Sequence, residues 1–218
     1  QAGDRVLSLT VMTESQLGVR LRCALENLSF LGAVRIGAED AFPIPEHINV
    51  RDVGNDGRFA PYWFDQFADE DIDAQRHYPG SKAKTFRRQL DSWLASLFPG
   101  AEANVQNVIA TSQMNLQFRL HELGSWQRPS NIGYGLTYAF PILVALLTAQ
   151  PGQVVVIDSP ESHLHPSAQS HMGRILATMA SAGVQIVVET HSDHLLNGVR
   201  LAVRDGTLLP ENLRIHFF

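Results

Sequence analysis

The chain has 218 residues, of which 44% are hydrophobic, so it can bury a core and we expect it to be globular. Its 17 Lys and Arg against 22 Asp and Glu give a formal net charge of −5, which argues against wholesale coating of nucleic acid but leaves a local basic patch open. The single cysteine, Cys23, excludes an internal disulfide and a cysteine-based metal cluster, and its neighbours predict a buried thiol in a strand.

The sequence shows neither a membrane span nor a signal peptide. It has no run of about 18 apolar residues, and its N-terminus lacks a basic region followed by an apolar one. Together with the lone cysteine, this predicts a cytoplasmic protein with no membrane partner. The chain begins at Gln1 and ends on "LRIHFF", which has the pattern of a strand cut short, so we expect part of a longer protein.

The first quarter of the chain has strand-like patterns followed by turn residues. Residues 5–27 alternate apolar and polar side chains on either side of "TESQLG", which predicts an antiparallel hairpin, and "FLGAVRI" (30–36) predicts a short buried strand. Residues 37–56 contain Pro43, Pro45 and "VGNDG", which predict a loop with little regular structure.

Helical patterns come next. The stretch "FAPYWFDQFADEDI" (59–72) predicts a helix, and residues 81–100 have apolar side chains at helical spacing before a Pro-Gly stop, which predicts an amphipathic helix. The stretch "NVQNVIATSQMNLQFRLHE" (104–122) then predicts a pair of strands.

From Ser130 onward the order is glycine-rich turn, apolar helix, strand, helix, strand, helix, strand. This alternation is typical of βα units that build a parallel sheet, whose strands are buried on both faces and therefore nearly all apolar. The strands are "QVVVI" (153–157) and "VQIVV" (184–188), and residues 166–183 form the predicted helix between them.

Acids and histidines follow both apolar strands at the point where ligands bind in open α/β sheets. Asp158 and Glu161 come after the first strand, and Glu189 and His191 after the second. An acid at such a strand end can hold Mg²⁺, and a second acid can orient the water that attacks a γ-phosphate.

These residues carry a family resemblance. The stretch "VVVIDSPESHLHP" (154–166) resembles the Walker B and D-loop segment of ABC-type ATPases, in the variant typical of predicted AAA/ABC-like ATPases related to the overcoming-lysogenization-defect (OLD) group. "VVETHSDHLLN" (187–197) is similar to the switch-histidine segment of that family, and "NIGYGLTYAFPIL" (131–143) to its signature segment. Weaker likenesses are the Leu-Gly-Pro-Leu-Arg-like strand at residues 30–43 and the Gly-x-Asp-Gly turn at residues 53–64.

The resemblance implies an α/β fold: a P-loop NTPase-like lobe, the head of an ABC ATPase, with a largely parallel sheet flanked by helices, an N-terminal antiparallel strand pair and a small helical region. Residues 1–218 would be the C-terminal portion of one ABC-type ATPase domain. Its parts would be a strand and loop part (1–58), a helical insertion with a strand pair (59–128), and the signature, Walker B and switch part (129–218).

The resemblance also implies site residues, with ATP and Mg²⁺ as the cofactors. Asp158 takes the Walker B position and would hold Mg²⁺, while His191 takes the switch position and would bond the γ-phosphate or the attacking water. The signature residues would contact ATP bound by the other subunit of a homodimer with composite sites; they are Asn131, Gly133, Gly135 and Thr137.

Two departures from an intact ATPase pattern stand out. The chain has no GxxxxGK followed by Ser or Thr, so either the phosphate-binding loop lies upstream or this chain does not bind nucleotide alone. Ser159 follows the Walker B acid where many ATPases have a catalytic glutamate, and a serine hydroxyl is no general base at neutral pH. We therefore assign the catalytic or water-positioning role to Glu161, with stabilisation of a hinge as the alternative.

Several residue groups have two interpretations. The pairs His163 with His165 and His191 with His194 are zinc ligands or, in our preferred interpretation, residues of the D-loop and of a helix start. Arg35 contacts phosphate or pairs with an acid. The basic residues at 82–88, with scattered charge from Arg119, Arg128 and Arg174, form a solvated helix face or a nucleic-acid contact. Trp63, Trp93 and Trp126 are expected to pack in the core or between lobes rather than to serve as base-stacking platforms.

We therefore expect ATP binding and hydrolysis by a dimerising ATPase, coupled to a DNA-related or phage-defence activity through DNA or a companion nuclease. The alternative is a regulatory or dimerisation module that binds nucleotide without hydrolysing it. A metal-dependent hydrolase that uses the histidines is a third interpretation.

Overall fold

The computed structural model describes residues 18, 27–37, 39–46, 51–108, 112–150 and 152–217. Cys23 and nearly all of the hairpin predicted for residues 5–27 lie outside the described residues. The strands are β1 (Leu28–Leu31), β2 (Ala41–Pro43), β3 (Glu102–Val108), β4 (Gln113–Arg119), β5 (Val154–Asp158) and β6 (Gln185–Glu189). The helices are α2 (Ala60–Phe67), α3 (Phe86–Leu97), α4 (Tyr134–Thr148), α5 (Pro166–Ser181) and α6 (Asp193–Arg204).

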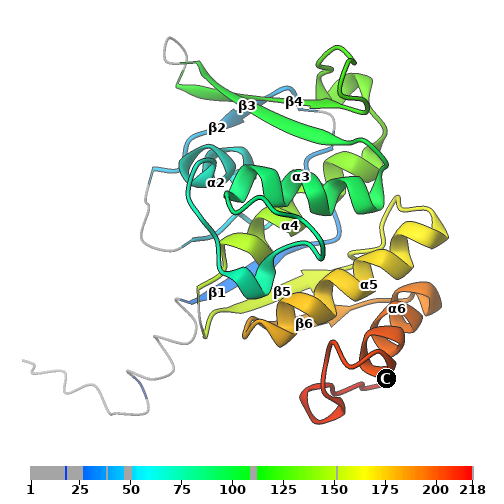
Figure 1. The fold of residues 1–218 in the computed structure, drawn as a ribbon. Coiled ribbons are helices and arrows are strands. Elements are labelled where there is room, and N and C mark those ends of the chain that lie inside the picture. The colour runs from blue at the N-terminus through cyan, green and yellow to red at the C-terminus, as the bar shows by residue number, and fades with distance from the viewer. Residues whose placement is uncertain are drawn as a thin grey trace, which may run out of the picture.

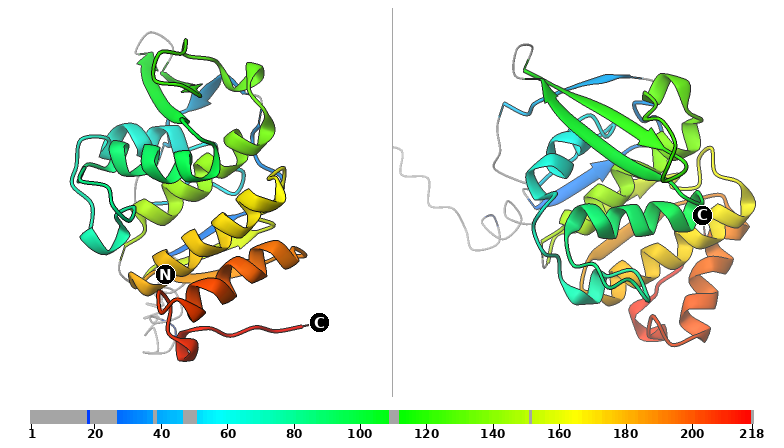
Figure 2. Two further views of the ribbon diagram at one scale, coloured as in Figure 1. Left: turned by 45° about the vertical axis from the view of Figure 1, so that its right-hand side comes forward. Right: turned by 45° about the horizontal axis from the view of Figure 1, so that its top comes forward.

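The strands form two separate sheets. One is a parallel sheet in the order β1-β5-β6, with β5 in the middle, and the other is an antiparallel sheet in the order β2-β4-β3. Helices α2, α3 and α4 lie between the two sheets, and α6 packs on α5 at the opposite end of the molecule from the antiparallel sheet (Figures 1 and 2). The predicted fold class, an α/β domain with a parallel sheet flanked by helices, is confirmed, and the antiparallel pairing in the structure joins β2, β4 and β3. The N-terminal antiparallel pair of that prediction lies almost entirely outside the described residues.

The main core fills the space between the sheets and these helices. Helix α4 is almost wholly buried, in keeping with its apolar sequence, and on the parallel sheet Leu31, Val155 and Ile157 are fully buried. Two of the predicted core tryptophans, Trp63 and Trp93, are buried, whereas Trp126 is part-exposed and stacks under the Arg119 guanidinium.

The parallel sheet is less buried than predicted. Register pairs Phe30 with Val156 and Val156 with Val187, and on this face of the sheet Phe30 is 43% and Val187 49% exposed in the part of the chain that the structure describes. The expectation that both apolar strands are buried on both faces is thus wrong for β6. An apolar strand can also lie at the edge of a sheet, as β6 does, where its side chains are partly exposed. Apolar composition alone therefore does not show that both faces of a strand are buried.

Three element boundaries also differ from the predictions. The first parallel strand ends at Leu31, and Gly32 to Ile36 form a loop whose amides bond the carbonyls of Asn55 and Asp56 instead of a strand. Residues 41–43, expected in a loop, form β2 because they pair with β4. Residues 213–217, expected as a strand, are not in one, and they pair with no strand among the described residues. In all three segments, whether a strand forms depends on pairing with another segment of the folded chain.

Asp91 of α3 is a buried carboxyl group, 9% exposed, that accepts a hydrogen bond from the Ala103 amide at 3.0 Å. Burial raises its pKa to about 6. Because the folded pKa lies above the unfolded one, the neutral form stabilises the fold below about pH 4, and this stability is lost as pH rises through 6.

We expect Asp91→Asn to remove this loss, since an amide oxygen can still accept from Ala103. Between pH 4 and pH 7.5 the wild type should lose up to about 3 kcal/mol relative to the variant. Urea unfolding of both proteins at several pH values measures the difference. Parallel pH profiles of the two proteins would contradict the assignment.

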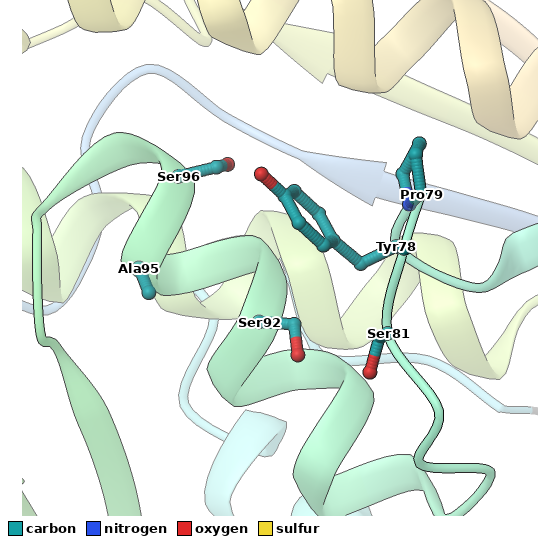
Figure 3. Close-up of a pocket in the computed structure, with 7 residues that line it drawn as sticks. Tyr78, Pro79, Ser81, Ser92, Ala95 and Ser96 are labelled. Carbon is teal, nitrogen blue, oxygen red and sulfur yellow. The ribbon is translucent and has the colours of Figure 1, made fainter.

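An open hollow of about 430 Å³ lies between α3 and the loop before it. In Figure 3 the Tyr78 ring points across it toward Ser96. Its lining is Tyr78, Pro79, Gly80, Ser81, Ser92, Ala95 and Ser96, and includes none of the residues at the strand ends. Polar lining residues such as Tyr78 and Ser92 are neither the acids nor the histidines that the sequence predicted for the site. The hollow is therefore separate from the candidate site.

Among the described helices, none has the length and apolar character needed to cross a membrane.

Candidate functional site

The carboxyl ends of β5 and β6 lie side by side. Asp158 is the register partner of Glu189, and the Ser159 amide donates to the Glu189 carbonyl at 3.0 Å, which extends the pairing by one residue. The Ser159 hydroxyl lies 2.8 Å from Asp158 Oδ1 and 3.3 Å from Glu189 Oε2. The single proton of this hydroxyl can therefore go to either carboxylate at the tip of the parallel sheet, and the Asp158 contact is the shorter one.

Ser159 has an unusual backbone conformation, with φ +48°, and His163 in the same turn has φ +62°. The left-handed region is uncommon for residues with a side chain, and strained residues of this kind cluster at functional sites. The amides of Ser162 and Leu164 bond the carbonyls of Ser159 and Glu161, at 3.1 and 3.0 Å, and close the turn. Residues 158–164 are called the acid turn below.

Glu161 connects the acid turn to the end of β6. Its Oε1 accepts a hydrogen bond from the His191 amide at 3.1 Å. Its Oε2 is buried and has no hydrogen-bond partner among the described residues. A buried carboxylate oxygen without a donor is costly, so this oxygen is the atom of the site that most needs a further partner.

His191 stands at the surface, with 92% of its side chain exposed. Its Nε2 lies 3.2 Å from Glu189 Oε1, so a carboxylate holds one ring nitrogen, and Nδ1 has no hydrogen bond among the described residues. The sequence pattern placed Glu189 after the second apolar strand, but we predicted no role for it. Its position directly after an apolar strand, like that of Asp158, was the signal that could have assigned one.

The predicted signature residues divide into two pairs. Asn131 and Gly133 are exposed before the first residue of α4, and a Cβ on Gly133 would meet no atom within 4 Å. Gly135 and Thr137 are buried: a Cβ on Gly135 would lie 2.7 Å from the His163 carbonyl oxygen, and the Thr137 hydroxyl donates to the Tyr134 carbonyl. In this structure the buried pair contacts the chain's own atoms.

The two histidines of the acid turn each make a local contact. The His163 ring packs edge-on against Tyr138 and beside Tyr134, with centroid separations of 4.6 and 5.5 Å. His165 caps α5, since its Nδ1 accepts from the Ser167 amide at 3.4 Å. Within the described ranges no group of three or more His, Cys, Asp or Glu is arranged to hold a metal ion.

Arg35, from the loop after β1, lies under the acid turn and is 4% exposed. Its Nη2 donates to the Asp158 carbonyl at 2.5 Å and to the Ser159 carbonyl at 3.3 Å, and its guanidinium lies over the Tyr138 ring. Burial lowers the pKa of Arg35 to about 10, while Tyr138, Asp158 and Glu161 act in the opposite direction. Neither predicted role, contact with phosphate or pairing with an acid, describes these bonds to backbone oxygens.

The arginines outside the site mostly pair with acids or amides. Arg119 pairs with Glu102, Arg174 with Asp205 at 2.9 Å and Arg128 with Asp40 at 3.7 Å, while Arg87 bonds the Asn104 side chain. These contacts favour the interpretation of the basic residues as a solvated, ion-paired surface.

The oxygen atoms at the strand ends fit a hard divalent cation. Asp158, Glu189 and the Ser159 hydroxyl offer the donor type that Mg²⁺ prefers, and Mg²⁺ is usually held by one or two carboxylates together with substrate phosphates and water. The Glu161 Oε2 atom, in the same turn as Asp158, is buried without a hydrogen-bond partner among the described residues. The donor set therefore agrees with the cofactor that the sequence led us to expect.

Comparison with known proteins gives a family match over most of the chain. A family model described as "AAA domain, putative AbiEii toxin, Type IV TA system" matches residues 27–197. A stretch of 49 residues is 37% identical to the Old nuclease of Escherichia phage P2; the stretch is 22% of this chain and 8% of that nuclease, so the match spans a small part of the relative.

Solved structures of SMC ATPase heads share part of the fold. A structure from a study of ATP-driven dimerization of SMC ATPases has a TM-score of 0.42 and 16% identity over 51% of this chain and 70% of its own. The Smc head of Pyrococcus furiosus has a TM-score of 0.40 and 14% identity over 51% of this chain and 29% of its own. Likeness at this level carries no conclusion about activity.

Proposed function

The chain belongs to the AAA domain family described as putative AbiEii toxin, Type IV TA system, and from this premise we propose that it binds ATP with Mg²⁺ and hydrolyses it. The observation that carries the proposal is that Asp158 and Glu189 end adjacent parallel strands and that the His191 amide beyond the second strand bonds Glu161 beyond the first. The phosphate-binding loop would come from residues outside this chain, because the sequence lacks GxxxxGK followed by Ser or Thr.

Asp158 would hold Mg²⁺, with its carboxylate oriented by the Ser159 hydroxyl. When bound, Mg²⁺ supplies charge neutralisation for the phosphates. Ser159 cannot take a proton from water at neutral pH, but its hydroxyl lies within hydrogen-bond distance of both the Asp158 and the Glu189 carboxylates. The substitution at this position therefore supports cofactor binding and leaves proton transfer to another residue.

Glu161 would orient the attacking water and accept its proton. The bond from the His191 amide fixes Oε1, and the second oxygen is buried without a donor among the described residues. His191 would bond the γ-phosphate or the same water through Nδ1, with Glu189 holding the other ring nitrogen.

Two exposed residues, Asn131 and Gly133, would contact ATP held by a second copy of the chain, so that two composite sites form in a homodimer. The 49-residue likeness to the Old nuclease supports an output that involves DNA and a nuclease, in phage defence or another DNA-related process. A cytoplasmic location fits this assignment.

A second candidate function is a nucleotide-dependent dimerisation module that does not hydrolyse ATP. The bond between Glu161 and the His191 amide favours it, since this bond is what a purely structural tie between the two strand ends requires. Both functions require ATP binding, but only the first requires that the bound ATP is hydrolysed.

ATP turnover by the intact protein, measured against Mg²⁺ concentration, tests the proposal. We expect Asp158→Asn to reduce the rate at least about tenfold and to raise the Mg²⁺ requirement, because a carboxylate ligand is lost without a change of shape. Asp69→Asn, the same change at an exposed position of the loop after α2, is the matched control. A wild type that neither binds nor hydrolyses ATP would refute the proposed function.

A further inference from the structure

Arg35 is delivered to the acid turn by a loop that is fixed on both sides. The Gly32 amide donates to the Asn55 carbonyl at 2.8 Å, and the Ile36 amide to the Asp56 carbonyl at 2.9 Å. A Cβ on Gly37 would lie 2.4 Å from the nearest ring carbon of Tyr134, so the loop packs directly on α4. Hydrogen bonds and packing therefore hold in place the backbone that carries the Arg35 side chain.

All side-chain hydrogen bonds of Arg35 within the described residues end on the acid turn. They go to the carbonyls of Asp158 and Ser159, while Nε and Nη1 are buried without a partner there. Ser159 is the residue with φ +48°, a conformation that the surrounding structure must hold in place. The Arg35 guanidinium bonds one carbonyl on each side of the Ser159 Cα, and so supplies such a restraint.

We infer that Arg35 is a positioning residue, which holds the acid turn in the conformation that aims the carboxylates of Asp158 and Glu161 at the site. It acts through backbone carbonyls and touches neither ATP nor Mg²⁺. The inference rests on the proposed function for its catalytic consequence, but the conformation of the turn is a property of the chain itself.

Arg76 offers a matched control. It is also a buried arginine, 6% exposed, and it also donates to two carbonyls, those of Leu147 and Ala149. These carbonyls lie at the end of α4, before β5 begins, and so at the opposite end of β5 from Asp158. Loss of Arg76 removes the same kind of interaction without reaching the acid turn.

Amide hydrogen exchange in the intact protein tests the positioning directly. In Arg35→Met we expect the amides of Ser162 and Leu164, which close the turn, to exchange at least tenfold faster than in Arg76→Met. The amide of Ile142 in α4 reports global unfolding and corrects for any difference in stability. Arg35→Lys should fall between wild type and Arg35→Met, because an ammonium keeps the charge but not the planar fork.

ATP turnover is the second measurement. We expect Arg35→Met to lower kcat at least tenfold with little change in KM for ATP, and Arg76→Met to keep the kcat of its folded fraction. Equal exchange of the turn amides in both Met variants would overturn the inference, as would faster exchange with unchanged kcat. If the wild type has no ATPase activity, the proposed function fails, and the exchange data alone still decide whether Arg35 holds the turn.

Discussion

Replacing Glu161 with Gln in the intact protein is expected to reduce ATP turnover about 100-fold or more while ATP binding persists. Gln keeps an oxygen that accepts from the His191 amide, so the tie between the two strand ends survives. It loses the carboxylate that would take a proton from water, and general-base catalysis contributes about 100-fold to 10,000-fold. Single-turnover hydrolysis and ATP-induced thermal stabilisation measure the two effects separately.

Two further variants make this test decisive. Glu161→Ala removes both the base and the bond to His191, whereas Glu122→Gln makes the same chemical change at an exposed loop position. Full turnover in Glu161→Gln together with its loss in Glu161→Ala would assign Glu161 to the hinge role and leave the catalytic base to be found elsewhere. Turnover unchanged in both would remove Glu161 from the site.

Gly198→Ala is expected to destabilise the fold by about 3 kcal/mol, although alanine is the better helix former. Helices α5 and α6 touch through a glycine on each. A Cβ on Gly198 would lie 2.0 Å from the Ser170 carbonyl oxygen, and a Cβ on Gly173 would lie 2.2 Å from the Leu195 carbonyl oxygen. Both obstacles are backbone atoms, so no side chain can move aside, and the helices would have to separate.

Denaturant unfolding of Gly198→Ala beside the wild type measures this cost. Asn197→Ala, one residue earlier on the exposed side of α6, is the matched control and should change stability by less than about 0.5 kcal/mol. A Gly198→Ala midpoint at or above that of the wild type would show that the two helices can move apart freely, and would argue against the close crossing.

Local sequence patterns were sufficient for most elements of the second half of the chain. The apolar runs at 153–157 and 184–188 lie within one residue of β5 and β6, and the helix predicted for 166–183 ends two residues beyond α5. The strand pair predicted at 104–122 is confirmed as β3 and β4. These segments succeed because their periodicity and their Pro and Gly boundaries act over a few residues.

The candidate site was predictable in part. Parallel strands end at the same edge of a sheet, so the proximity of Asp158 and Glu189 follows once both strands are recognised. The bond from the His191 amide to Glu161 and the burial of Gly135 and Thr137 depend on side-chain packing, which residue spacing does not encode. The roles proposed for these residues stay predictions.

By itself the sequence determined the order of strands and helices from residue 130 to the end of α6 at Arg204 and the acids that follow each apolar run, because both are properties of neighbouring residues. Only the tertiary structure decided that Arg35, 123 positions before Asp158, supports the acid turn, and that Gly173 and Gly198 form the crossing of α5 and α6. Contacts between distant segments depend on how the whole chain packs, so no local pattern could assign them.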